Sequence, residues 1–158
     1  MTRTAAMILT ALGLGTPALA DVNIADVDAC FEAARTGQAD PAVCINAAQD
    51  SCLDNAQETP AVSALCFLEA REAWSDAVSQ TFAEIVPTMD ETDAAVLQIE
   101  TKYALLGNLL QCDRIEELSL AASDLTSEAI SIQSARCQAS ATAAMYLRLY
   151  RLRLAQTD

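Results

Sequence analysis

The chain has 158 residues, of which 22 are acidic and 9 are basic, so its formal charge is −13 at neutral pH. DNA, RNA and anionic membranes are disfavoured as partners, because each would repel a chain of this charge. The sequence contains no histidine, which removes the Ser-His and Cys-His nucleophile arrangements. We therefore expect a protein that is not an enzyme and has no catalytic residues.

The first 20 residues are typical of a cleavable secretion signal. Thr2 and Arg3 precede an apolar run over 5–14, and residues 18–20 read Ala-Leu-Ala, an A-x-A cleavage site. The run is shorter than the roughly 20 residues needed to span a bilayer, and no later segment offers a second candidate. We expect a mature single domain over 21–158, with a formal charge of −14, that is periplasmic or secreted.

Alanine is abundant and runs of β-branched residues are missing, which predicts an all-α fold. Asn23 begins a first helix over 24–36, and Gly37 lies where a C-terminal cap belongs. Pro41 and Pro60 begin the second and third helices, because proline is tolerated in the first turn of a helix. We expect a disulfide-stapled bundle of about five antiparallel helices.

The third helix is predicted to end at Pro87 and to turn an apolar stripe toward the core. That stripe consists of Val62, Leu65, Cys66, Ala70, Ala73, Trp74, Ala77, Val78, Phe82 and Ile85. Thr88 and Glu91 resemble a capping box for a fourth helix. The fourth helix runs through Val96, Tyr103, Leu106, Leu110, Ile115 and Leu118, with Gly107 as a point of bending or interruption.

A break near 123–126 leads into a last helix, which carries Arg148, Arg151 and Arg153 near its end. These arginines have two interpretations, as an anion site for a ligand such as a cell-wall fragment or as ordinary compensation of the helix dipole. Compensation of the helix dipole is the simpler interpretation. Tyr146 and Tyr150 lie four residues apart and are expected to pack against a neighbouring helix.

The six cysteines permit fifteen connectivities, but their positions favour one of them. The midpoints of consecutive pairs fall at Gly37, at Thr59 and near 124–125, each of which is a predicted turn. Antiparallel helices place residues equidistant from a turn side by side. A bridge between Cys44 and Cys52 is disfavoured, because eight residues along one helix separate them by about 12 Å, beyond the roughly 7 Å that a disulfide allows. The predicted pairs are Cys30 with Cys44, Cys52 with Cys66, and Cys112 with Cys137.

Three acidic clusters could in principle hold calcium or supply a carboxylate pair. They are Asp26 with Asp28, the segment 90–93, and Asp113 with Glu116 and Glu117. Helix N-terminal charges and solvated faces explain them more simply, and no segment fits the glycine-containing calcium loop. We expect no metal and no cofactor.

The spacing C-x13-C-x7-C-x13-C, the series Cys66, Trp74, Val78 and Phe82, and a late cysteine followed by a leucine- and arginine-rich helix resemble the lysozyme-inhibitor LprI-like family. That family comprises small exported, cysteine-rich helical domains, and most of its members have no assigned function. The resemblance covers about 30–154. It implies a binding role, in which an exported protein blocks a lysozyme.

Two hypotheses follow for the function. The first is an acidic inhibitor or binder of a basic protein such as lysozyme, which would associate in a salt-sensitive manner through Asp113, Glu116 and Glu117. The alternative is a structural or accessory envelope protein that acts with an unidentified partner. A clustered acidic or apolar surface patch would favour the first hypothesis, and evenly scattered charge would favour the second.

Overall fold

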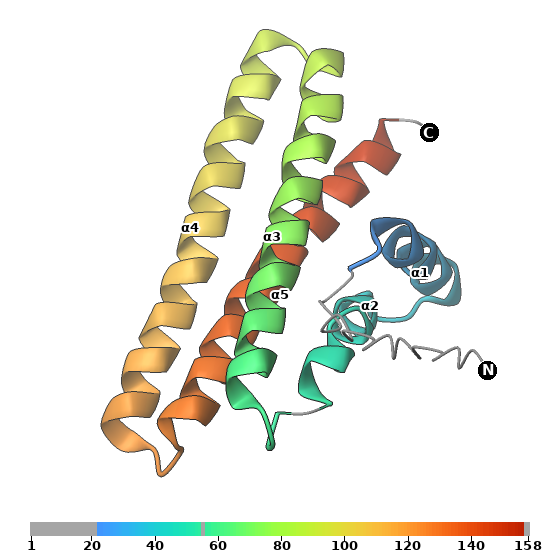
Figure 1. Cartoon of the computed structure of the whole chain (residues 1–158). Helices are drawn as coiled ribbons and strands as arrows, with labels where there is room; N and C mark the ends of the chain where they lie inside the picture. Colours follow the sequence, from blue (N-terminus) through green and yellow to red (C-terminus); the bar gives the residue numbers. More distant parts are fainter. Residues whose placement is uncertain (1–21, 55, 157–158) are drawn as a thin grey trace, which may run out of the picture.

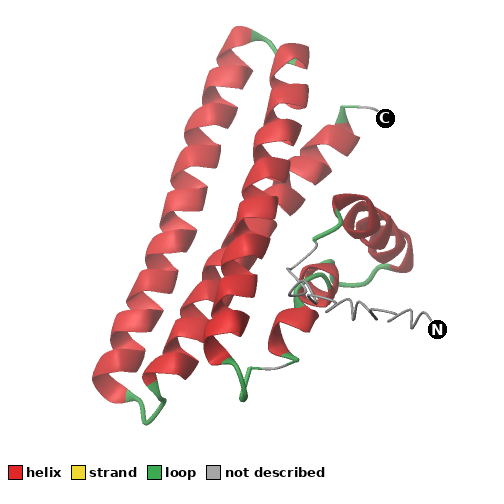
Figure 2. Cartoon of the chain, in the orientation of Figure 1, coloured by secondary structure: helices red, strands yellow, loops and turns green. Residues whose placement is uncertain are grey.

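The computed structural model describes residues 22–54 and 56–156, and every regular element in these ranges is helical. The all-α fold class is therefore confirmed (Figures 1 and 2). The five α-helices described are α1 (Ile24–Gly37), α2 (Ala42–Ala47), α3 (Pro60–Ile85), α4 (Glu91–Ala122) and α5 (Ser127–Ala155). Short 3-10 helices, η1 (Asp50–Leu53) and η2 (Val86–Thr88), precede and follow α3. The predicted signal over 1–20 lies outside these ranges.

The long helices α3, α4 and α5 form the body of the molecule. Helix α5 packs along α3 over much of its length and also packs on α4 (Figure 1). Close approach of α5 is possible because Ala135, Ala139 and Ala143 are buried on it. None of the helices described here is both long enough and apolar enough to cross a membrane.

Trp74 lies at the centre of the core with 0% of its surface exposed, as its place in the apolar stripe predicts. Its ring lies 5.7 Å from that of Tyr146 on α5. Tyr150, one turn further along α5, lies 5.3 Å from Phe31 of α1. The expectation that the two tyrosines pack against neighbouring helices is confirmed, and these rings join α1, α3 and α5 in one core.

Three disulfides staple the fold, and they join the same cysteines as the sequential map predicts. The Cα atoms are 5.8 Å apart in Cys30–Cys44, 5.4 Å in Cys52–Cys66 and 5.6 Å in Cys112–Cys137. The premise of a single helix from Cys44 to Cys52 is wrong, because α2 ends at Ala47 and η1 begins only at Asp50.

The end of α1 and the course of α4 through Gly107 differ in detail from the prediction. The left-handed residue after α1 is Gln38, with φ 54°, and not Gly37, because α1 continues through the glycine. The N–H of Ala39 then donates to the carbonyl of Ala34 at 2.8 Å and closes the helix end. Helix α4 is continuous through Gly107.

The capping box predicted at Thr88 and Glu91 is wrong. The N-cap is Asp90, whose carboxylate accepts from the N–H of Asp93 at 2.9 Å. Thr88 instead donates its hydroxyl hydrogen to the carbonyl of Ile85 at 2.7 Å, because η2 carries the chain three residues beyond α3 before α4 begins.

The predicted core stripe of α3 is wrong at its first two positions. Val62 and Leu65 are exposed, whereas the neighbouring Ser63 and Cys66 are buried. The first turns of α3 contact η1 through the buried side, where the hydroxyl of Ser63 donates to the carbonyl of Cys52 at 2.5 Å. The side that carries Val62 and Leu65 faces outward there.

Candidate functional site

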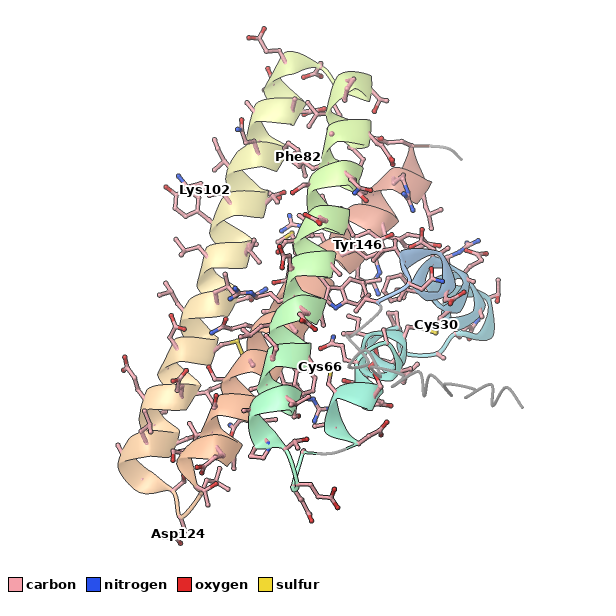
Figure 3. All side chains as sticks on the ribbon, viewed as in Figure 1. Cys30, Cys66, Phe82, Lys102, Asp124 and Tyr146 are labelled. Carbon is pink, nitrogen blue, oxygen red and sulfur yellow. A yellow bond between two sulfur atoms is a disulfide. The ribbon has the colours of Figure 1, made fainter. Side chains whose placement is uncertain are left out.

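Helices α4 and α5 form a long antiparallel hairpin whose closed end lies at the bottom of the molecule, beside the first turn of α3 (Figures 1 and 3). We call residues 113–128 the hairpin end. The bridge Cys112–Cys137 joins the two helices directly above it. Because both helices are tied at this level, the hairpin end has little freedom to splay.

Hydrogen bonds shape the turn itself. At the end of α4 the hydroxyl of Ser123 donates to the carbonyl of Ser119 at 2.6 Å and accepts from the N–H of Leu125 at 3.3 Å. Thr126 caps α5, where its hydroxyl accepts from the N–H of Ala129 at 3.2 Å. The predicted break over 123–126 is confirmed, and serine and threonine produce it by satisfying the free backbone groups of both helix ends.

The hairpin end exposes four large apolar side chains, one of which, Ile115, has 41% of its surface accessible. Leu118, Leu120 and Leu125 have 54%, 63% and 50% of their surface accessible. Five acidic residues and one basic residue share the segment, which therefore has a net charge of −4. Asp124 lies at its tip (Figure 3). The hairpin end therefore combines exposed apolar side chains with a strong negative charge.

The three carboxylates predicted to bind a partner are divided by the structure. Asp113 and Glu117 are exposed and lie four residues apart on one face of α4. Glu116 is half-buried and accepts a hydrogen bond from the hydroxyl of Ser134 on α5. Asp113 and Glu117 are thus available to a partner, whereas Glu116 joins the two helices of the hairpin.

A further carboxylate at the hairpin end is held in its charged form. The pKa of Glu128 lies below its ordinary value because the carboxylate accepts from its own backbone N–H and from the hydroxyl of Thr126. The negative charge of Glu128 therefore persists to lower pH than that of an ordinary glutamate. Arg114, its one cation, lies 3.4 Å from the side-chain oxygen of Gln111.

The leucines of the hairpin end were missed by sequence reasoning, which took Leu118 only as a marker of a helix. Leu120 and Leu125 received no interpretation. A usable signal was present, because Leu118 and Leu120 are two residues apart and point to different sides of a helix. At least one of the two must therefore lie outside the face of α4 that packs on its neighbour.

The arginines of α5 are mostly engaged within the molecule. Arg148 pairs with Glu100 of α4, and Arg153 pairs with Asp28 at 2.9 Å. Arg148 and Arg151 also line a hollow of about 720 Å³ between α4 and α5, together with Asp93 and Glu100. Because the hollow carries both acidic and basic side chains, charge compensation explains these arginines better than a dedicated anion site does.

The described part of the chain contains no group of three or more acidic or cysteine side chains placed to hold a metal ion. Asp28 lies in an ion pair with Arg153, and Asp90 caps α4. Asp28 and Asp90, which belong to two of the acidic clusters considered for calcium, thus have structural roles.

A second exposed apolar surface lies on α4, turned away from the face that packs on α5, with Val96 at its edge next to the hollow between the two helices. We call it the outer stripe, and its members are 46% to 60% exposed. It consists of Val96, Ile99, Tyr103, Leu106 and Leu110. The side chain of Lys102 lies next to it, with its ammonium 5.3 Å from the ring centre of Tyr103.

No protein-family model, curated protein or solved structure matches the chain significantly. The resemblance in cysteine spacing to the LprI-like family therefore stays an expectation.

Proposed function

We propose that the protein is an exported binding protein without catalytic activity, which binds and inhibits a basic cell-wall hydrolase such as lysozyme. The observation that carries this proposal is the hairpin end, a disulfide-stapled helix turn at one end of the molecule that exposes three leucines and several carboxylates. The turn at the end of a helical hairpin can enter a concave surface. Substrate clefts are the main concave surfaces of hydrolases.

The physical terms for such binding are favourable. Full burial of a leucine side chain contributes about 1.5–3 kcal/mol, and the half-exposed Leu118, Leu120 and Leu125 can each supply part of this on different sides of the hairpin end. Asp113 and Glu117 attract a basic partner and raise the rate of encounter. The bridge Cys112–Cys137 reduces the ordering cost, because the hairpin end is already held in shape.

The test is lysozyme activity with and without the oxidised protein over 21–158. We expect stoichiometric inhibition that weakens between about 50 and about 500 mM salt, because the charges are exposed. Leu120→Ala should weaken inhibition at least about tenfold, which corresponds to about 1.4 kcal/mol. Leu65→Ala is the matched control, since Leu65 is an exposed leucine on α3.

The double variant Asp113→Asn with Glu117→Gln tests the electrostatic part. It should reduce inhibition at low salt and leave a smaller salt dependence. An absence of inhibition at micromolar concentration, or equal losses in Leu120→Ala and Leu65→Ala, would contradict the proposal.

The alternative function is a structural or accessory envelope protein. The observation that favours it is the outer stripe, since an exposed apolar helix face supports assembly. A protein that assembles through α4 and leaves lysozyme activity unchanged would have this role.

A further inference from the structure

The outer stripe is regular in a way that scattered surface residues are not. Its members follow one another at intervals of three, four, three and four residues, from Val96 to Leu110. Over these 14 positions the stripe is about 21 Å long. Figure 3 shows Lys102, at its edge, directed away from α3 and α5.

Packing within the molecule does not account for the stripe. The fully buried residues of α4 are Leu97 and Cys112, on the side of α5, which is the helix that α4 packs against. The outer stripe lies on the other side, apart from Val96 at its edge, which lines the hollow between α4 and α5. A helix that is apolar on both sides is normally buried on both, so α4 has one face covered and one face uncovered within the described chain.

The spacing of the stripe indicates what covers it. Alternating intervals of three and four form the seam of a coiled coil, whose partner is another helix. The stripe is also the least charged part of α4, since Glu100 and Lys102 are the charged residues between 94 and 112, and Glu100 is paired with Arg148. Two copies of this acidic chain would meet here with little local repulsion.

Charge also selects the direction of pairing. Asp113 takes the next position after Leu110, and Glu117 the one after that, so the stripe ends in carboxylates. Parallel pairing would place these carboxylates beside their own copies. Antiparallel pairing places them at opposite ends, about 30 Å apart at 1.5 Å per residue, which is well beyond the Debye length of about 8 Å at physiological salt.

The available area is sufficient for a dimer. Five half-exposed large side chains present roughly 500 Å² of apolar surface per copy, at the upper end of what monomeric proteins expose. Pairing two stripes buries on the order of 1,000 Å², the size at which specific interfaces begin.

We infer that the outer stripe is the interface of a homodimer, in which the α4 helices of two copies pack antiparallel. The dimer presents its two hairpin ends at opposite ends of the assembly. The inference does not rest on the proposed function, because the outer stripe (96–110) and the hairpin end (113–128) are different segments of the chain.

Sedimentation velocity of the oxidised protein over 21–158, without any partner, tests this inference. We expect a monomer–dimer equilibrium between about 1 and about 200 µM, with a dissociation constant in the micromolar range. Leu106→Lys and Ile99→Lys should each raise that constant at least about tenfold, because a charge enters the seam. Leu125→Lys, at an exposed leucine of the turn beyond α4, should leave it unchanged.

Circular dichroism melting of the same variants shows whether each one folds. Both stripe residues are half-exposed in the monomer, so their variants should melt close to the parent. A protein that stays monomeric at about 200 µM, or a dimer that Leu106→Lys and Ile99→Lys leave intact, would overturn the inference. A dimer that forms only at high salt would overturn the antiparallel arrangement.

Discussion

Asp28 is the residue that ties α1 to α5. Its carboxylate accepts from the hydroxyl of Tyr146 at 2.5 Å and from a guanidinium N–H of Arg153 at 2.9 Å. Arg153 also reaches Glu84 of α3 at 3.4 Å. Burial raises the pKa of Tyr146 above its ordinary value, and the hydrogen bond to Asp28 together with the Asp28 charge raises it further.

This environment predicts a loss of stability at high pH. The folded state keeps the proton of Tyr146 where the unfolded chain, with a pKa of about 10, releases it. The folded state therefore binds more protons, and the free energy of unfolding falls as the pH rises above about 10. Urea unfolding between about pH 8 and about pH 11 measures the decline.

The variant Tyr146→Phe isolates this contribution. It should decline less steeply with pH than the parent, because one of the groups that favour the protonated folded state is gone. Tyr150 contributes in the same direction, since burial raises its pKa as well. Tyr103→Phe, at an exposed tyrosine of the outer stripe, is the control and should keep the full decline. If the free energy of unfolding fell with pH at the same rate in both variants, Tyr146 would not be a cause of the decline.

At the scale of elements, the hairpin of α4 and α5 depends on one covalent bond at its end. The Cys112–Cys137 bridge closes a loop with a sequence separation of 25. The Cys52–Cys66 bridge closes a loop with a separation of 14, between η1 and α3. The two bridges stabilise different parts of the chain, and their removal should be distinguishable.

Replacing Cys112 and Cys137 together by serine should lower the free energy of unfolding by roughly 3 kcal/mol. It should also weaken inhibition of lysozyme, because the hairpin end loses its fixed shape. The matched variant replaces Cys52 and Cys66 by serine. It should lose a similar amount of stability and retain the inhibition, as measured by thermal melting and the activity assay. Equal inhibition by both variants would mean that the Cys112–Cys137 bridge does not contribute to lysozyme binding.

The sequence predicts the helices well because proline and the polar caps mark their ends. Pro60 begins α3, and the break before α5 follows from residues 123–126. It does not predict which side of α4 is covered. Leu97 and Leu106 are equally apolar, and only the position of α5 in space decides that Leu97 is buried and Leu106 is exposed. The candidate site was predicted in part, since Asp113 and Glu117 are exposed but the side chain of Glu116 is committed to Ser134.

The whole molecule consists of a large helical body and a smaller N-terminal segment, which we define as α1, α2 and η1. The body has long helices with extensive mutual packing. The segment has helices of 14 and 6 residues, and isolated helices of such length are marginal in water. Two of the three disulfides involve this segment, so covalent bonds compensate for its small size.

Hydrogen exchange should reveal this division. In the oxidised protein the amides of α1 should be protected through the contacts of Phe31 and Asp28. After reduction, the N-terminal segment should exchange faster by a larger factor than α3 and α5. Mass spectrometry of peptides from both parts measures the two factors. Equal acceleration everywhere would mean that the molecule opens as one cooperative unit.

The connectivity of the bridges has a consequence for maturation. Three disulfides indicate an oxidising environment outside the cytoplasm. Each bridge joins a cysteine to the next one along the chain, so a polypeptide that enters such a compartment N-terminus first presents its native partners one pair at a time. An oxidant that joins thiols in order of arrival produces the native map directly. Reshuffling of wrong pairs by thiol exchange is then not needed, and the protein should mature with an oxidant alone, without a disulfide isomerase.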